Sequence, residues 1–269
     1  MILKQLSVKD PPAGTAETFP FSVPAVRSLG TLSFDSAVTY FVGENGTGKS
    51  TLLEAIAAAV GSPTVGSEAV ARDATLEAQR RLAQSLKLTW SRRSTRGFFL
   101  RAEDFFGFAK RMAQLRAELE TRLSQVETEF AGASAYARNL AAGPANASLA
   151  DMKRLYGEDL DARSHGESFL ALFSARLAPG GLYLLDEPEA ALSPQSQLAL
   201  LALFREGERD GSQFIVATHS PILLAYPGSC IYSFDRDPVD RVQYAELEHV
   251  ALTRSFLEDP ERYLRRLFD

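Results

Sequence analysis

The chain has 269 residues, of which 45% are hydrophobic and 23% are charged, as in an ordinary globular protein. This composition excludes a disordered tail, a collagen-like repeat and a small disulfide-stapled domain, and it predicts one or two domains. With 29 basic and 34 acidic residues, the net charge of −5 does not indicate a strongly basic nucleic-acid-binding protein. The single cysteine, Cys230, excludes an internal disulfide and favours a reducing compartment.

The N-terminal residues are not typical of a secretion signal, because Lys4, Lys9 and Asp10 interrupt the apolar run that such a signal needs. No stretch approaches the roughly 18 apolar residues of a membrane-spanning helix. We therefore expect a cytoplasmic protein that does not bind a membrane.

The first hundred residues predict strands more than helices. Residues 1–34 contain short β-like runs broken by proline and glycine, which favours antiparallel strands and turns. The β-branched and aromatic residues 38–42 predict a buried strand. We then expect helices over 51–60 and 68–85, and strands over 86–90 and 97–102 that a polar turn joins. That turn contains Arg92, Arg93 and Arg96, which we interpret as a solvated cluster, with a partner or nucleic-acid contact as the alternative.

Helices dominate the middle of the chain, and helices and strands alternate after it. Residues 105–130 predict a long charged helix, and residues 131–150, which include Pro144, predict weak order. Alternation of this kind is typical of a mostly parallel sheet. The later elements are expected at 169–178 (helix), 182–185 (strand), 194–206 (helix), 213–217 (strand) and 229–234 (strand), followed by a basic helix with Arg262, Arg265 and Arg266.

A glycine-rich loop stands between the predicted strand 38–42 and the predicted helix 51–60. Glycine lets backbone N–H groups wrap around phosphates, and the N-terminus of the following helix adds positive potential. The sequence therefore predicts a nucleotide site in which Lys49 contacts the β- and γ-phosphates, Ser50 binds Mg²⁺ and Thr51 contacts the α-phosphate. The loop reads Gly43, Glu44, Asn45, Gly46, Thr47, Gly48, Lys49, Ser50 and fits the pattern G-x-x-x-x-G-K-[ST].

Two later strands end in polar residues suited to the same site. The apolar run 182–185 ends in Asp186 and Glu187, which predicts a Mg²⁺ ligand followed by a general base for an attacking water. The strand 213–217 leads to His219, and ligands of open α/β sheets bind at such strand ends. We expect His219 to contact the γ-phosphate or the attacking water.

Together with the turn from Ser164 to Ser168, these segments resemble ABC-type ATPases. Their order is Walker A (43–50), signature turn (164–168), Walker B (182–187) and switch histidine (His219). The phrases at 184–194 and 217–221 are closest to the branch that contains SMC, RecF and OLD-like ATPase heads, and to small stand-alone bacterial ATPases. The resemblance implies an α/β P-loop NTPase fold of the ABC-ATPase type, with a mostly parallel sheet, an antiparallel β portion at the N-terminus and a small helical insertion.

The resemblance also implies that two subunits enclose two ATP molecules with Mg²⁺, and that hydrolysis opens this homodimer. In that arrangement Ser164, Gly166 and Glu167 of one subunit complete the nucleotide site of the other. The chain departs from the usual signature at His165, and Ser193 stands where an aspartate is usual. The resemblance also implies a glutamine after the strand 97–102, near Mg²⁺. No glutamine stands there in this chain, so Glu103 is our candidate for this position and for a further Mg²⁺ ligand.

We expect the ATPase domain to be formed by residues 1–104 and 161–269, with a helical lobe at 105–160 between them. The preferred function is ATP hydrolysis that drives a conformational switch, in DNA maintenance or defence. The alternatives are a nucleotide-gated module that hydrolyses little ATP and recruits a partner protein, and a transporter ATPase subunit. A DNA or protein partner stays open, and no adenine-stacking residue is assigned.

Overall fold

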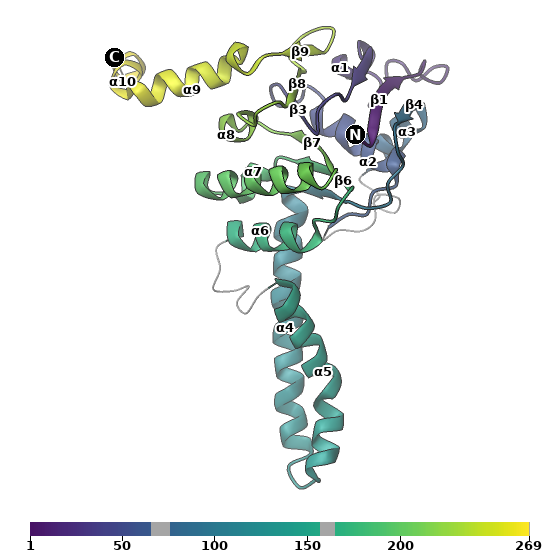
Figure 1. Ribbon diagram of the computed structural model, residues 1–269, viewed down its shortest axis with the longest axis vertical. Coiled ribbons are helices and arrows are strands. Elements are labelled where there is room, and N and C mark those ends of the chain that lie inside the picture. Colours follow the sequence, from purple (N-terminus) through teal and green to yellow (C-terminus); the bar gives the residue numbers. More distant parts are fainter. Residues whose placement is uncertain (66–75, 157–164, 269) are drawn as a thin grey trace.

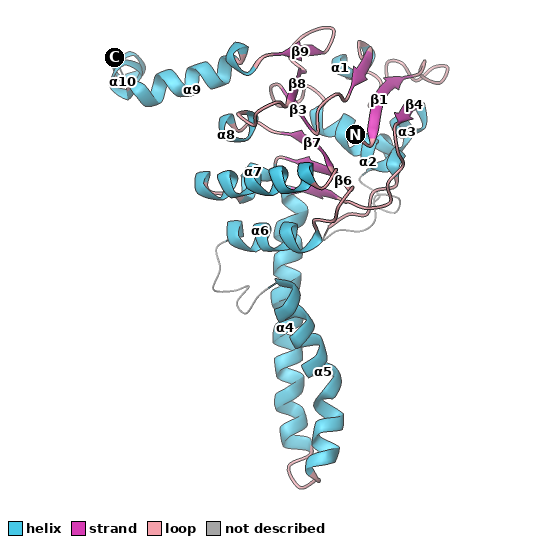
Figure 2. Ribbon diagram, viewed as in Figure 1, coloured by secondary structure: helices cyan, strands magenta, loops and turns pink. Residues whose placement is uncertain are grey.

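A computed structural model describes residues 1–65, 76–156 and 165–268 of the chain. Two sheets stand side by side (Figures 1 and 2). The smaller one is antiparallel, with strand order β2-β1-β4, and is formed by β1 (Leu3–Val8), β2 (Thr31–Ser33) and β4 (Leu86–Trp90). It confirms the expected antiparallel β portion at the N-terminus.

The larger sheet has six strands in the order β5-β6-β7-β3-β8-β9, all parallel except the edge strand β9. Because parallel strands end at one edge, the loops after β3, β6, β7 and β8 meet there. The strands are β3 (Val38–Val42), β5 (Phe99–Arg101), β6 (Leu182–Asp186), β7 (Gln213–Ala217), β8 (Cys230–Ser233) and β9 (Asp240–Val242).

Two apolar layers cover the faces of this sheet, because neighbouring side chains of a strand point to opposite faces. Phe41 and Ile215 face one layer, which includes Leu52 and Ile56 of α2 (Lys49–Val60). On the other face lie aromatic residues of α6 (His165–Arg176) and α7 (Pro194–Arg209), including Phe204. The shorter elements are α1 (Pro24–Arg27), α3 (Glu77–Ser85), α8 (Pro221–Leu224) and the 3₁₀ helices η2 (Pro188–Ala191) and η3 (Tyr244–Glu246). The helix expected at 68–85 is described from residue 77 onward.

One buried side chain joins the two sheets. The amide of Gln213, at the start of β7, is fully buried. Its Oε1 accepts hydrogen bonds from the backbone N–H groups of Ile2 (2.9 Å) and Leu3 (2.8 Å), and its Nε2 donates to the Leu3 carbonyl (2.9 Å). The first strand of the chain is thereby fixed to the middle of the larger sheet.

A helical hairpin extends from the body (Figure 1), formed by α4 (Ala102–Glu129) and α5 (Ala135–Tyr156). The 28 residues of α4 correspond to a length of about 42 Å. Residues 131–150, which we expect to be mobile or loosely helical, belong to a regular helix from residue 135 onward. This helix, α5, packs along α4, and Val126 and Ala145 are buried. Tertiary contact stabilises a helix that propensity alone leaves marginal, even with Pro144 inside it.

The strands β4 and β5 do not form the expected hairpin, since β4 joins the smaller sheet and β5 joins β6. Two arginines of the turn between β4 and β5 donate hydrogen bonds to backbone carbonyl groups just after α6 and α7. Arg96 Nη1 donates to the Pro179 carbonyl at 3.0 Å, and Arg92 Nη2 donates to the Gly211 carbonyl at 3.5 Å. Arg93 lies over the ring of Trp90, with Cζ 6.0 Å from its centroid. These contacts support the interpretation of the cluster as a structural surface.

Beyond β9 the chain forms α9 (Glu248–Glu258) and α10 (Pro260–Phe268), which lead away from the sheet (Figure 1). We call these two helices the C-terminal arm. In the described part of the chain, no helix has the length and apolar character to cross a membrane.

Candidate functional site

The glycine-rich loop connects β3 to α2, as the sequence predicts. Gly43, Gly46 and Gly48 have φ angles of 147°, 84° and 103°, in the region that disfavours other residues. Gly48 is the N-cap of α2, so the first N–H groups of this helix point into the loop. Asn45 lies at the exposed turn between the two outer glycines of the loop. The loop is therefore a concave set of backbone donors at a helix N-terminus, suited to an anion.

Lys49 is held across this loop. Its Nζ donates hydrogen bonds to the carbonyl groups of Gly43 (2.7 Å) and Glu44 (2.8 Å). Burial lowers the pKa of Lys49, while the carboxylates of Glu187 and Asp186 oppose that shift. The amine thus lies inside the loop, where a phosphate can replace its two carbonyl partners. Thr47 closes the loop by donating from Oγ1 to the Glu44 carbonyl at 2.9 Å.

Ser50 and Asp186 are adjacent, although 136 residues separate them in the sequence. Ser50 Oγ, in the first turn of α2, donates to Asp186 Oδ1 at 3.1 Å. Asp186 ends β6 next to β7, and burial raises its pKa to about 7. A hydroxyl and a carboxylate at the mouth of a phosphate loop are the oxygen ligands that Mg²⁺ prefers. This pair fits Mg²⁺ together with phosphate oxygens and water. The described residues contain no cluster of three or more metal-binding side chains.

Glu187 and His219 face each other at the ends of β6 and β7. The Glu187 Oε1 atom lies 3.8 Å from His219 Nε2, and the two side chains are 44% and 39% exposed. Among the residues that the structure describes, Glu187 is the non-glycine residue with a positive φ, 48°. Such a conformation is rare for glutamate and is typical of functional turns. Burial lowers the pKa of His219, so its imidazole is neutral near pH 7.

Glu189 positions the histidine loop, a role that the sequence analysis missed. Its Oε1 accepts a hydrogen bond from the His219 backbone N–H at 2.6 Å. Burial raises the pKa of Glu189. The sequence does show Glu189 as a third acidic residue, two positions after Glu187. Only the pairing of β6 with β7 shows that Glu189 contacts the loop after β7.

A second missed residue is Asp235, just after β8. Its Oδ1 accepts the backbone N–H of Glu44 at 2.7 Å, which fixes the first turn of the phosphate loop. Beside it lies a cavity of about 910 Å³ between this loop and the start of α9. His219 and His249 both line this cavity, although they are 30 residues apart and no motif links His249 to the loop.

A buried charge network lies behind the Mg²⁺-side residues. Arg101 is the residue of β5 that pairs with Asp186 of β6. Its guanidinium donates to both carboxylate oxygens of Asp104 (2.7 and 3.0 Å) and lies 3.4 Å from Glu54 Oε1. Glu54 Oε2 also accepts a hydrogen bond from Gln79 Nε2 at 2.9 Å. The network connects the beginning of α4 to α2, one turn after Ser50.

The remaining predicted residues, where the structure describes them, lie at the beginnings of three helices. Gly166 and Glu167 begin α6, where a Cβ on Gly166 would approach Ser196 Oγ of α7 to 2.9 Å. Ser164 lies outside the described residues. Glu103 lies in the first turn of α4. Thr51 follows Ser50 in α2 and is half-buried.

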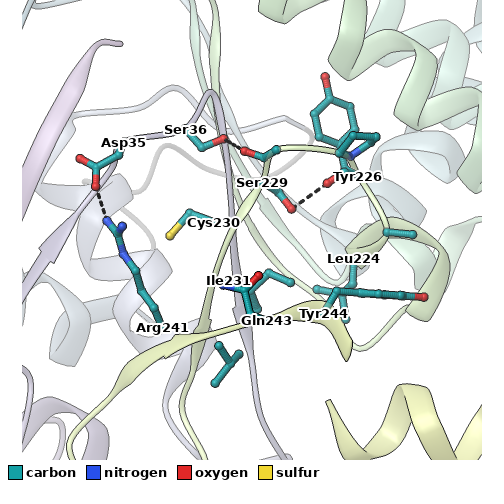
Figure 3. Close-up of a pocket in the computed structure, with 14 residues that line it drawn as sticks. Asp35, Ser36, Leu224, Tyr226, Ser229, Cys230, Ile231, Arg241, Gln243 and Tyr244 are labelled. Carbon is teal, nitrogen blue, oxygen red and sulfur yellow. Dashed lines mark hydrogen bonds and ion pairs between the residues drawn. The ribbon is translucent and has the colours of Figure 1, made fainter. Parts of the chain in front are cut away.

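A second cavity, of about 500 Å³, lies at the other end of β8 (Figure 3). Its one arginine, Arg241, turns toward Asp35 and is paired with it. Cys230 begins β8, where it is half-buried, packs against the apolar layer and also lines this cavity. No unpaired charge of these lining residues points to a ligand.

Two family models match the chain. The model described as "AAA domain" matches residues 25–112, which include the phosphate loop. The model described as "AAA domain, putative AbiEii toxin, Type IV TA system" matches residues 167–225, which include β6 and β7. The curated macrolide export ATP-binding/permease protein MacB of Pectobacterium atrosepticum is 27% identical over 180 residues, which are 66% of this chain. The match spans about a quarter of that protein's length.

Solved structures that are similar to this chain include an SMC head domain and an ATP-binding cassette. An SMC head domain of Pyrococcus furiosus bound to the C-terminal domain of ScpA is 14% identical, with a TM-score of 0.48, over 96% of this chain and 99% of that chain. The nucleotide-free ATP-binding cassette of an ABC transporter is 15% identical, with a TM-score of 0.45, over 87% and 91% of the two chains. The two AAA-domain matches, which include the phosphate loop and the strands β6 and β7, together with the mostly parallel sheet indicate a P-loop ATPase domain with an ABC-like α/β fold.

Proposed function

We propose that the chain hydrolyses ATP in a homodimer that encloses two nucleotides, and that this reaction drives a conformational switch. The observation that carries the proposal is the convergence of Lys49, the Ser50–Asp186 pair and the Glu187–His219 pair on one sheet edge. These groups supply phosphate binding, a metal position, a base and a polar contact for the γ-phosphate within one site.

In the proposed reaction, the loop N–H groups and Lys49 hold the β- and γ-phosphates. Mg²⁺, held by Ser50 and Asp186, would neutralise charge on the phosphate oxygens. Glu187 accepts a proton from the attacking water, whose oxygen bonds to the γ-phosphorus as the bond to the β–γ bridging oxygen breaks. His219 donates an N–H to the γ-phosphate and, 3.8 Å from Glu187, keeps the base near the water.

The second copy is needed because the beginning of α6 contacts α7, not the phosphate loop of its own chain. In the dimer, Ser164, Gly166 and Glu167 of one copy would complete the site of the other, with the N-terminus of α6 toward the γ-phosphate. ADP lacks that phosphate, so hydrolysis weakens the interface. Coupling to DNA maintenance or defence is the role that the family resemblance favours.

Replacing Glu187 by Gln tests the mechanism. We expect turnover to fall at least about 100-fold while ATP binding persists, because the base is lost and the phosphate donors remain. Turnover per subunit should rise with wild-type concentration and then saturate, and light scattering should detect a larger dimer fraction of Glu187→Gln with ATP than without it. The matched control is Glu206→Gln on the exposed side of α7, which should retain turnover. Unchanged turnover in Glu187→Gln contradicts the assignment of the base.

A second function, nucleotide-gated recruitment of a partner protein, is favoured by the α4–α5 hairpin. Tyr136 and Leu140, in the first turns of α5, are 78% and 68% exposed. The hairpin extends away from the sheets (Figure 1). If the wild type binds ATP but shows negligible turnover at every concentration, this second function leads. Adding DNA and then candidate partner proteins would identify what restores turnover.

A further inference from the structure

The C-terminal arm has two unlike faces and little contact with the body. On α10, Arg262, Arg265 and Arg266 stand at helical spacing on one face. The opposite face carries apolar side chains, of which Leu267 and Phe268 are 74% and 80% exposed. Among the described residues, Arg262 and Arg266 have no ion-pair partner, whereas Arg265 lies 3.9 Å from Glu261.

The arm is nonetheless a defined element. The rings of Phe256 and Tyr263 pack edge to face with centroids 5.8 Å apart, and Tyr263 Oη donates to Ser255 Oγ at 2.9 Å. These contacts fix α10 against the far end of α9. The 11 residues of α9 correspond to about 16 Å, so α10 is held away from the body on which α9 begins.

The cavity at the foot of this arm has the complementary charge. Its rim carries Glu44, Asp235, Glu246 and Glu248, and Arg236 is the one arginine among its lining residues. Arg236 lies 3.7 Å from Glu246 and offsets that charge, which leaves three acids around the cavity. Apolar side chains, including Leu247 and the 57% exposed Leu252, complete the lining.

We propose that α10 of a second copy docks at this acid-lined cavity, with its arginine face toward Glu248 and Asp235. The cavity and α10 are complementary, but they lie at opposite ends of one rigid helix of the same chain. A two-fold axis satisfies both surfaces at once, because each copy then presents its α10 to the other's cavity.

This mutual docking of the two C-terminal arms, the arm exchange, rests on the proposed function in one respect: the partner is a second copy of the chain. It adds a contact that needs no nucleotide and lies directly beside the phosphate loop. The arms would hold two copies together while the ATP-dependent interface opens and closes.

The test is self-association of the full chain without nucleotide, measured by analytical ultracentrifugation. Arg266→Glu and Glu248→Arg should each weaken the dimer at least about tenfold, because each places like charges at both contacts. An equimolar mixture of the two variants should associate again, since one pairing is native and the other has its charges exchanged. Recovery in the mixture also shows that both variants are folded.

The matched control is Arg209→Glu, at the end of α7 away from the cavity, which should associate as the wild type does. A wild type that stays monomeric at about 100 µM without nucleotide overturns the proposal. So does a mixture that associates no better than its components. An ATP-dependent dimer of Glu187→Gln would persist in either case, so failure of the arm exchange is distinct from failure of the proposed ATPase mechanism.

Discussion

Replacing Asp186 by Asn should stabilise the nucleotide-free protein at high pH while removing the proposed Mg²⁺ ligand. Burial raises the pKa of Asp186 from 3.8 to about 7. A group with a raised folded-state pKa favours folding below its unfolded pKa, and that contribution is lost as pH rises through the folded value. The wild type should therefore lose stability between about pH 4 and pH 7, as the folded state retains a proton that the unfolded chain releases.

The size of the effect follows from the shift. About three pKa units at 1.36 kcal/mol each set a ceiling of about 4 kcal/mol on the penalty above pH 7. At pH 5 only about 1.2 of those units apply, or about 1.6 kcal/mol. Asn cannot ionise and its Oδ1 can still accept the Ser50 hydroxyl. Relative to Asp186→Asn, the wild type should lose about 2–3 kcal/mol between pH 5 and pH 8.

The assay is urea unfolding in EDTA at several pH values from 5 to 8, without nucleotide. Asp10→Asn changes an exposed carboxylate in the same way and serves as the control, which should follow the wild type. Equal pH dependence in the wild type and Asp186→Asn would refute the reasoning, because it would mean that Asp186 is ionised in the folded protein at pH 5. Higher stability of Asp186→Asn at pH 8, together with loss of Mg²⁺-dependent turnover, supports both parts of the argument.

Two further changes test the scaffold. Arg101→Leu leaves the buried carboxylates of Glu54 and Asp104 without their guanidinium, so it should destabilise the fold by about 3–5 kcal/mol in urea unfolding; a change below about 1 kcal/mol would mean that the network is solvated. Gly97→Ala should cost about 3 kcal/mol or more, because its φ is 109° and a Cβ would lie 1.9 Å from the Leu182 carbonyl oxygen. Its control, Gly143→Ala in α5, meets no neighbouring atom and should stabilise the helix by about 1 kcal/mol, and equal melting temperatures of the two variants would contradict this.

The phosphate loop could be predicted from sequence because its chemistry is local. Glycines at fixed spacing, a lysine and a hydroxyl specify a strand, a turn and a helix over residues 38–60, with no need of distant contacts. The apolar run before Asp186 and Glu187 is local in the same sense. The alternation of strands and helices likewise indicated a parallel sheet, whose strand ends bring such motifs together.

The position of the α4–α5 hairpin depended on packing that no local pattern reports. Residues 131–150 have the alanine, glycine and proline content of a loose segment, yet they belong to a helix because α4 offers them a surface. Similarly, β4 and β5 are separated by few residues but belong to different sheets. Gly97 allows the backbone to approach β6, and this contact decides the register of β5.

The amino-acid sequence by itself determined the nucleotide chemistry of this protein, because short-range backbone geometry creates the phosphate loop. Only the tertiary structure decided which distant groups support that chemistry. Glu189 and Asp235 act across neighbouring strands, and Arg101 joins the end of β5 to α2. Their partners depend on strand order, which long-range packing fixes. The same holds for the cavity at the foot of α9, since it forms between segments that are about 200 residues apart in the sequence.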